Sequence, residues 1–407
     1  MSAWRSATIE SLASGKKSAL STGPFGSAVA SKNFRQSGVP MLRGSNLSDD
    51  VGTKLDERDL VFLDPDLAAT FERSTARQGD LVFTCWGSVG QIGLIDAAAQ
   101  YGEYIVSNKQ MKLSPDPGQV DSLFLYYNMS QPKMIFEVQS QAIGSTIPGF
   151  NLGQLRALTV QIPELAEQRA IADVLGALDE KIAANTKIAA TTDEILSARF
   201  SALSEAETDE VRLGDIADVN VETVKPVAGG QLRYIDIASV DVGSFNFPAL
   251  TGWDTAPSRA RRRVTRGDTI WSTVRPNRRS HALNLSDDSL LVGSTGLAVI
   301  SPRTVGFAYV YEVTKMPEFT AYLETVAEGS AYPAVRADRF SEAPVPLLCE
   351  DARGSFEALA APLRESVHAL EIENRILAAT RDALLPQLMS GKLRVKDAEK
   401  ALESAGV

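Results

Sequence analysis

A cluster of arginines lies between Ser258 and His281. The segment contains eight arginines and a single acid, Asp268, so its net charge is +7 with His281 neutral. The arginines are Arg259, Arg261, Arg262, Arg263, Arg266, Arg275, Arg278 and Arg279. Arginine presents a planar fork of N–H donors that fits phosphate oxygens and guanine edges, so the cluster predicts contact with nucleic acid. The alternative is a surface patch whose arginines pair with acids elsewhere in the fold.

The chain as a whole has the opposite charge. Its 41 Lys and Arg residues and 51 Asp and Glu residues give a net charge of −10, which alone argues against a nucleic-acid partner. An average over 407 residues hides the local cluster, however. We interpret the acidic remainder as suited to a subunit that is surrounded by partner proteins, which supply part of the affinity for nucleic acid.

Residue types that carry catalysis or bind metals are scarce. The chain has two histidines, His281 and His368, and two cysteines, Cys85 and Cys349, which exclude a multi-histidine metal site and a disulfide framework. The segment Ser14–Ser18 superficially resembles a phosphate-binding loop but lacks its upstream glycine and its Gly-Lys-Ser/Thr triplet. An Asn/Asp-Pro-Pro motif for holding a flipped adenine is absent from the sequence. We therefore interpret the chain as non-catalytic, with no cofactor of its own.

The sequence repeats itself with a period of about 188 residues. Asn185–Leu196 matches Asn374–Leu385 at an offset of 189 residues, and Arg77–Val82 matches Thr265–Ile270 at an offset of 188. This period is too long for a solenoid repeat, so it predicts the duplication of a domain. The Gly-Asp pair that the second match shares is explained by a turn that leads into a strand.

Each half begins with a globular stretch of short, mostly apolar runs separated by Gly, Pro, Asn and Asp. These patterns predict strands and helices. The strands are expected at Leu81–Thr84, Gly90–Ile95, Leu232–Ile237 and Leu297–Ile300, and the helices at Val120–Tyr127 and Phe319–Val326. We therefore predict two mixed α/β (α+β) domains, over residues 1–162 and 206–352.

A long amphipathic helix is predicted after each globular stretch, over residues 163–205 and 353–395. Pro163 suits the first turn of the first helix. Ser355 is a candidate N-cap of the second helix, and Pro362 is expected to mark its start or a kink. Residues 396–407 are predicted to form a C-terminal tail.

The second helix has apolar residues at strict seven-residue intervals, which are typical of a coiled coil. The simplest partner of each helix is the other, in an antiparallel pair, and Asn185 and Asn374 are then expected to pair across it. The predicted fold is thus two α/β domains separated by a long antiparallel two-helix coiled coil, with pseudo-twofold internal duplication. The alternative is that each helix packs only on its own domain.

Several motifs resemble those of one family, the specificity subunits of Type I restriction–modification systems. The segment Ile162–Ile182, which contains Ala-Glu-Gln-Arg-Ala-Ile, resembles the central conserved region of that family, and Leu384–Leu393 resembles its distal conserved region. Further segments resemble its target-recognition-domain signatures: Gly23–Ser27, Gly38–Asn46, Gly79–Phe83 and Gly87–Gly90. The resemblance covers essentially the whole chain. In the second domain, Trp271–Pro276 replaces the Gly-Ser-Val-Gly turn, as expected if the two domains recognise different sequences.

This resemblance implies a sequence-specific DNA-binding subunit in which each domain recognises one half of a two-part target in double-stranded DNA. It implies that the helices set the spacer and dock two modification (methyltransferase) subunits, and that restriction (translocase) subunits can join. S-adenosylmethionine and ATP are expected on those partner subunits. We expect a cytoplasmic protein without a membrane segment. Two alternatives stay open: a specificity subunit of another restriction system with a fused methyltransferase-nuclease partner, and a two-headed coiled-coil scaffold that binds no DNA.

Candidate contact residues follow from residue type. For DNA they are Lys32, Arg35, Arg43, Asn46, Lys109 and Gln110 in the first domain, and Arg259, Arg261, Arg262, Arg263, Arg275, Asn277, Arg278 and Arg279 in the second. Trp86 is expected in the core, and His281 either near a phosphate or without a role. For subunit binding they are residues expected on exposed helix faces: Glu164, Glu167, Gln168, Arg169, Asp179 and Lys181, with Arg381, Gln387 and Lys392. The alternative for each of these is simple solvation.

Overall fold

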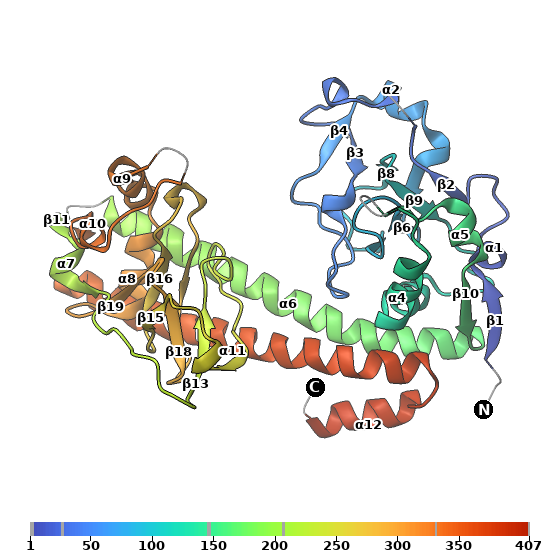
Figure 1. The fold of residues 1–407 in the computed structure, drawn as a ribbon. Coiled ribbons are helices and arrows are strands. Elements are labelled where there is room, and N and C mark those ends of the chain that lie inside the picture. The colour runs from blue at the N-terminus through green and yellow to red at the C-terminus, as the bar shows by residue number, and fades with distance from the viewer. Residues whose placement is uncertain (1–3, 26–27, 145–147, 206–207, 330–331, 406–407) are drawn as a thin grey trace. The chain divides into compact units, whose positions relative to one another are not determined.

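The structure, a computed structural model, describes residues 4–25, 28–144, 148–205, 208–329 and 332–405 (Figure 1). Residues 26 and 27 of the predicted Gly23–Ser27 signature thus lie outside the described residues. The chain forms two compact units. Unit 1 consists of residues 1–183 and 374–407, and unit 2 of residues 184–373. The predicted segment boundaries at 162, 205, 352 and 395 remain a proposal.

Unit 1 contains two four-stranded sheets and one two-stranded sheet. The first sheet has the order β2 (Leu20–Thr22), β9 (Gln110–Leu113), β6 (Leu81–Thr84), β7 (Ile92–Leu94), and all its strands are antiparallel. The second has the order β4 (Val61–Leu63), β3 (Val39–Leu42), β8 (Glu103–Val106), β5 (Thr75–Arg77). Its central pair, β3 and β8, is parallel. The two-stranded sheet pairs β1 (Arg5–Thr8) with β10 (Thr159–Ile162).

Unit 2 repeats this topology strand for strand. One sheet has the order β12 (Ala217–Val219), β19 (Leu297–Pro302), β16 (Thr269–Ser272), β17 (His281–Leu283). The other has the order β14 (Leu250–Gly252), β13 (Gln231–Ile235), β18 (Leu291–Ser294), β15 (Ala260–Arg263), with β13 and β18 parallel. The two-stranded sheet pairs β11 (Asp209–Arg212) with β20 (Pro344–Leu347). The shared order and the shared parallel pair confirm the predicted duplication.

The shorter α-helices also correspond between the units, except for Pro65–Ala69, in whose place unit 2 has the 3-10 helix Trp253–Thr255. In unit 1 they are α1 (Ile9–Leu12), α2 (Pro65–Ala69), α3 (Ser122–Ser130), α4 (Pro132–Gln141) and α5 (Leu152–Ala157). In unit 2 they are α7 (Leu213–Ile216), α8 (Phe307–Lys315), α9 (Pro317–Val326) and α10 (Ala337–Ser341). The strands predicted from apolar runs are confirmed as β6, β7, β13 and β19, and the predicted helices as α3 and α9.

The repeated Gly-Asp pair forms the predicted turn before a strand. Gly79 and Gly267 both have a φ of 89°, which favours glycine at this position. The following aspartates accept a backbone N–H three residues upstream, Asp80 from Arg77 at 2.9 Å and Asp268 from Thr265 at 2.7 Å. The carboxylates therefore have a structural role in starting β6 and β16, as predicted from the sequence.

The two long helices are α6 (Leu165–Ser204) and α11 (Glu350–Met389). In unit 1, Ile171, Leu175 and Leu178 of α6 share one core with α11 residues 377, 384 and 388. In unit 2, Leu196 and Phe200 of α6 share a core with residues 356 and 360 of α11. Pairwise contacts give the direction: Asp179 and Ile182 bond Arg381 and Asn374 in unit 1, and Asn185 and Asp193 bond Glu373 and Arg364 in unit 2, so the segments run antiparallel in each unit.

The start of α11 and its course at Pro362 differ from the prediction. The helix α11 begins at Glu350, before the expected cap at Ser355, and continues through Pro362. Pro362 is exposed, so the carbonyl group that its missing N–H leaves without a partner faces solvent.

The asparagines that were expected to pair with each other both bond to the opposite helix. Asn185 donates to Glu373 at 2.7 Å and Asn374 to the carbonyl of Ile182 at 3.5 Å. Their pairing with each other stays a prediction.

The predicted C-terminal tail is a helix, α12 (Val395–Ala405). Ala398 is buried in the core of unit 1, and Val395 and Leu402 pack against that core. Their spacing of three and four residues places them on one helix face, which the sequence pattern could have indicated. Within the described residues, no helix combines the length and apolar character needed to cross a membrane.

Candidate nucleic-acid interface

A concavity of about 520 Å³ opens on unit 1 where three loops meet. We call it the first concavity. The loops follow β3, β6 and β8. The side chains that give it polar or aromatic character are Phe34, Arg43, Ser45, Thr84, Trp86, Ser88, Ser107, Asn108, Lys109 and Gln110. It thus brings together three of the six predicted DNA contacts of the first domain.

The floor of the first concavity has hydrogen-bonding groups without protein partners. Gln110 is fully buried, and among the described residues its Nε2 group has no hydrogen-bond partner, while its Oε1 atom accepts from the Ser107 hydroxyl. The hydroxyl of Thr84 is likewise buried without a partner in the described part of the chain. A buried donor without a partner costs about 1–3 kcal/mol, so both groups favour a polar ligand here.

Asn46, in contrast, is not available as a DNA contact. Its side chain is buried and accepts the N–H of Arg43 at 2.9 Å, while donating to the carbonyl of Asp56 at 2.9 Å. These bonds shape the loop after β3, which positions Arg43 at the concavity. The prediction for Asn46 is therefore corrected: its residue type suits base recognition, but its hydrogen bonds are used within the fold.

Trp86 lies at the wall of the first concavity, and the expectation that it belongs to the core is wrong. Half of its surface, 50%, is exposed. Its position is fixed by a β-bridge to Gly149, over which the indole ring lies. A Cβ atom at Gly149 would approach the ring to 2.5 Å, so only glycine fits beneath it. Trp86 therefore presents a rigid aromatic surface.

Unit 2 has a second concavity at the equivalent place, with a volume of about 740 Å³. The β-bridges Val274–Ala334 and Glu328–Ala334 repeat the bridges Trp86–Gly149 and Ile143–Gly149 of unit 1. The second concavity lies between the loop after β13 and the loop between β16 and β17. Its polar and aromatic lining consists of Ser239, Asp241, Ser244, Asn246, Ser272, Arg275, Arg278, Ser280 and Tyr332. The location is thus conserved between the units while the side chains differ.

The loop between β16 and β17 is held in an unusual conformation. Arg275 and Arg279 are left-handed, with φ of 53° and 55°, which costs roughly 1–2 kcal/mol for each non-glycine residue. Arg275 donates its N–H to Pro333 at 2.7 Å, and its guanidinium lies 4.6 Å from the centre of the Tyr332 ring. Between the two strained residues, Asn277 and Arg278 are exposed. Such strain persists where the surroundings fix a functional loop.

The other arginines of the cluster are distributed elsewhere. Arg261, Arg262 and Arg263 lie half-buried on the edge strand β15, and Arg259 is exposed just before it. Arg263 lies 3.5 Å from Glu222. Arg266 lies 3.2 Å from Asp287 and 2.5 Å from Glu365.

The alternative of pairing with acids thus holds for Arg263 and Arg266. For Arg275 and Arg278, no acid among the described residues lies within ion-pair distance. The sequence cluster is therefore not one surface, and the second concavity receives only Arg275 and Arg278 from it.

His281 belongs to the interior. It stacks on Trp271 with ring centres 5.2 Å apart, and its Nδ1 atom lies 2.5 Å from the carbonyl oxygen of Arg279. Burial lowers the pKa of His281 to about 4, so the ring is neutral at physiological pH. A neutral, buried imidazole supplies no charge for a phosphate, which excludes the first of the two roles considered for it.

Besides Asn46, two predicted DNA contacts of the first domain lie outside the first concavity. Lys32 and Arg35 are both exposed, and the Arg35 guanidinium donates to the carbonyls of Lys32 and Phe34, each at 3.0 Å. Phe34 itself lines the concavity, so these two cations are neighbours of a lining residue along the chain. Their role as DNA contacts remains a prediction.

The predicted subunit contacts divide into exposed and buried residues. Glu164, Arg169, Lys181, Gln387 and Lys392 are exposed as expected, and Glu167 is partly buried.

Gln168, Asp179 and Arg381 are buried, and their predicted exposure is wrong. The Gln168 amide accepts the N–H of Asp121 and donates to the carbonyls of Gln119 and Pro163, which ties the start of α6 to unit 1. Asp179 and Arg381 form a buried ion pair with 2.9 Å between Oδ1 and Nη1.

Apolar side chains on the outer surface of α6 were missed by the sequence analysis. Ile188 and Ile195 are 53% and 59% exposed, and their seven-residue separation puts them on the same helix face. The spacing was visible in the sequence, but it resembles that of the core residues on the same helix. Their exposure marks a surface suited to a protein partner.

Comparison with known proteins agrees with this architecture. The family model of the Type I restriction modification DNA specificity domain matches residues 27–192. The Type I restriction enzyme HindI specificity subunit of Haemophilus influenzae is 21% identical, covering 71% of this chain and 81% of that protein. The crystal structure of the Type I restriction-modification S subunit from M. genitalium aligns with a TM-score of 0.57 and 16% identity, covering 95% of this chain and 96% of that one. The HsdS subunit from Thermoanaerobacter tengcongensis aligns over 96% of this chain with 17% identity and a TM-score of 0.36.

The similarity to the M. genitalium structure shows the fold, with mixed helices and strands and long helices. The family model and the curated relative, together with the central-region motif at the start of α6, indicate the same class of protein. Residues 27–192 match the Type I restriction modification DNA specificity domain, and the chain is similar to the specificity subunits of Type I restriction–modification systems.

Proposed function

We propose that the two concavities are the surfaces with which this specificity subunit recognises DNA, each contacting one part of a two-part target sequence. One observation carries the proposal: the same concavity occurs in both units, at the place marked by the same pair of β-bridges, but with different side chains. A duplicated scaffold with divergent lining is what recognition of two different half-sites requires. The subunit itself carries out no reaction, and methylation and cleavage belong to its partners.

The lining supplies the donors and acceptors needed to distinguish base pairs. In the first concavity, the Gln110 amide suits adenine, and Arg43 and Lys109 suit guanine or phosphate. The exposed indole of Trp86 offers an apolar surface to a thymine methyl group or an unstacked base. In the second concavity, the forks of Arg275 and Arg278 suit guanine, while Asn246 suits adenine and Asp241 suits cytosine.

We further propose that α6 and α11 set the spacing between the half-sites and dock the modification subunits. The exposed pair Ile188 and Ile195 of unit 2 offers apolar contact area, and the exposed residues Lys187 and Glu194, next to them in the chain, offer charge. Interfaces combine such apolar anchors with a polar rim. The restriction subunits would then join the complex formed by this chain and the modification subunits.

Methylome sequencing tests the proposed recognition of a two-part target. The full chain is expressed with its modification subunits in a host that lacks other methyltransferases. We expect methylation at one motif made of two short sequences separated by a gap of constant length and variable sequence. Methylation confined to a continuous motif would contradict the role of two concavities.

Variants of the second concavity test its contact with DNA. Arg275→Ala combined with Arg278→Ala should weaken duplex binding and reduce the slope of log K against log salt by up to about 1.8, at about 0.9 per lost phosphate contact. Arg303→Ala is the matched control. Arg303 suits this purpose because it lies at the end of β19 that is away from the second concavity, directly after Pro302. The other end of β19 is near the concavity, because Gly296, just before this strand, accepts a hydrogen bond from Thr273. An unchanged slope in the double variant would exclude phosphate contact by these arginines. Unchanged affinity as well would refute the site.

Replacement of the exposed isoleucines tests the docking surface. Ile188→Ser with Ile195→Ser should reduce co-purification of the modification subunits at least tenfold, while leaving the melting temperature of the isolated chain unchanged, because neither side chain is in a core. Arg199→Ser, an exposed residue of the same helix, is the control. Normal co-purification of the double isoleucine variant would place the docking surface elsewhere.

A further inference from the structure

Each unit contains a buried cluster of charges between α6, α11 and one short helix of the globular portion. In unit 1 the short helix is α3, and in unit 2 it is the equivalent helix α8. Neither cluster is part of the proposed DNA surface. Their composition, compared position by position, carries an inference about how the two halves of the chain find each other.

In unit 1 the acid comes from α6 and the cation from α11. Asp179 Oδ1 lies 2.9 Å from Arg381 Nη1, and both side chains are only 3% exposed. The hydroxyl of Tyr127 donates to the other oxygen of Asp179 at 2.5 Å. Arg381 also lies 3.1 Å from the more exposed Asp50. Burial alone would lower the pKa of Arg381, but Asp179 and its acidic neighbours raise it, so the guanidinium stays charged.

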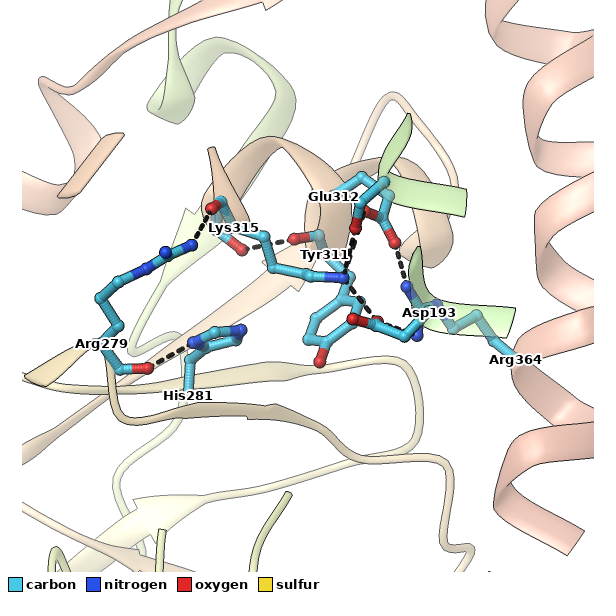
Figure 2. A network of polar contacts seen from close by, with 9 residues as sticks. Asp193, Arg279, His281, Tyr311, Glu312, Lys315 and Arg364 are labelled. Atoms are coloured by element: carbon cyan, nitrogen blue, oxygen red, sulfur yellow. Dashed lines mark hydrogen bonds and ion pairs between the residues drawn. The ribbon is translucent and has the colours of Figure 1, made fainter. Parts of the chain in front are cut away.

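In unit 2 the cation again comes from α11 and the acid from α6, but the polarity is reversed relative to the equivalent positions of the internal repeat. The cation, Arg364, comes from α11 and lies 2.6 Å from Asp193 of α6, while its second Nη group bonds Glu312 of α8 (Figure 2). Lys315 of α8 lies 2.5 Å from Asp193 and 3.4 Å from Glu312. Burial would raise the pKa of Asp193, but the Lys315 and Arg364 cations hold it below the usual value. Asp193 and Glu312 are thus balanced by two cations.

The sequence repeat shows that these positions are equivalent. Leu178-Asp179-Glu180 of α6 corresponds to Leu363-Arg364-Glu365 of α11, at an offset of 185 residues. The opposite sides of the clusters correspond as Ala189-Ala-Thr-Thr-Asp193 and Ala378-Ala-Thr-Arg-Asp382, which differ only in that Arg381 replaces Thr192. On the short helices, Tyr126-Tyr127 corresponds to Tyr311-Glu312, again at an offset of 185. The single difference within the stretch Ala378–Asp382 thus falls on Arg381, the residue that neutralises Asp179.

Association of the first half with a copy of itself would remove this neutralisation. In such a pair, Thr192 and Asp193 of one copy would take the place of Arg381 and Asp382 beside Asp179 of the other. The site would then contain Asp179 and Asp193 near Tyr127 and Asp50, without the arginine. An uncompensated buried charge is strongly destabilising, so this pair would be less stable than the pair of complementary halves.

We propose that the reversed polarity of the two clusters selects the complementary half of the chain as the partner of each half, and rejects a second copy of the same half. Buried ion pairs contribute little to stability compared with apolar residues of similar volume, so their retention in both units fits a role in specificity. The surface concerned is the α6–α11 contact within each unit, and the partner it fits is the opposite repeat.

The test uses the folded full chain with a protease site in place of residues 206 and 207, cleaved after purification. A preparation with an affinity tag at the N-terminus is mixed with an untagged one, partners exchange in mild denaturant, and the tagged first half is recovered. We expect it to retain the second half and to exclude the untagged first half by roughly 100-fold, the preference that corresponds to breaking one buried ion pair. Recovery of both in similar amounts would overturn the proposal.

A gain-of-function variant makes the test specific to the charge. Thr192→Arg gives the first half the arginine that distinguishes the repeats, so untagged first half should now be recovered at least tenfold more than from the wild type. Thr191→Arg adds the same charge at the exposed neighbouring position and should behave like the wild type.

A second variant tests the same idea if Thr192→Arg fails to fold. Asp179→Arg with Arg381→Asp keeps one cation and one acid in unit 1 while giving both halves the same polarity, and should also allow self-association. Charge-based selection would be refuted if Thr192→Arg and Thr191→Arg gave equal recovery of the untagged first half. It would also be refuted if the double variant Asp179→Arg with Arg381→Asp still excluded the untagged first half.

Discussion

Arg364 is the residue whose loss should most perturb unit 2. Replacement by methionine keeps most of the side-chain volume but removes one partner of Glu312, which is 1% exposed, and one partner of Asp193. Removal of one member of a buried ion pair costs about 3–5 kcal/mol. Lys315 and the hydroxyl of Ser197, 3.4 Å and 3.0 Å from Glu312, remain in place. We therefore expect the lower end of that range, about 3 kcal/mol.

A double-mutant cycle with Glu312→Gln separates the ion pair from packing. Because the glutamine removes the charge that Arg364 neutralises, the combined variant should be more stable than the sum of the single effects predicts, by roughly 1–3 kcal/mol. Hydrogen exchange of peptides from α8 and β16 reports the stability of unit 2 without assuming that the whole chain unfolds in one step. Arg199→Met, at an exposed site, is the control and should change the stability by less than about 0.5 kcal/mol. A cost below about 1 kcal/mol for Arg364→Met, or strict additivity, would show that the pair is not energetically coupled.

Three further predictions concern other parts of the molecule. Because burial lowers the pKa of His281 from 6.5 to about 4, the unfolded state binds more protons between these values, so unit 2 should lose about 2 kcal/mol between pH 7 and pH 5. NMR titration of the two histidines measures the pKa of His281 directly, and a pKa near 6.5 would contradict the prediction. His281→Phe should remove this contribution to the pH dependence of stability. Trp86→Ala should weaken binding to target duplex by roughly tenfold without affecting stability, if the indole contacts a base, whereas Phe136→Ala, also at an exposed aromatic residue, should bind like wild type in the same titration. Ala398→Asp should detach α12 from unit 1, which faster hydrogen exchange of residues 395–405 would reveal, and Glu399→Ala should not.

Features determined by local sequence were predictable. The strands β6, β13 and β19 follow from short apolar runs, and the duplication follows from matches such as the Gly-Asp turn, where the backbone needs a glycine with positive φ. The long helices follow from their seven-residue periodicity. The predicted ends of the long helices were less accurate. A helix can continue through a proline that lies on its exposed face, as α11 does at Pro362, and the sequence alone does not show which face is exposed.

Features determined by distant contacts were not predictable in this way. Trp86 follows a buried strand, and its exposure depends on Gly149, which is 63 positions further along the chain. Asp179 and Arg381 are charged residues within helical stretches, and solvation was the reasonable expectation for each alone. Their opposite charges at facing positions in an antiparallel alignment of the two helices are the signal that could have identified the pair. Each concavity is formed by loops that follow separate strands, so no single segment of sequence contains it.

The composition of unit 1 has a consequence for synthesis on the ribosome. Its core combines residues such as Leu12 and Phe124 with Leu384, Leu388 and Ala398, so the first globular portion needs the last part of the chain to complete its core. The intervening segment of unit 2, residues 184–373, takes roughly 10–40 s to translate at about 5–20 residues per second. During that interval the nascent first portion exposes the apolar surface that α11 and α12 later cover. Premature termination would therefore leave a product prone to aggregation rather than a working half, and protection of the nascent chain should matter more for this protein than for one of similar length whose domains close in order.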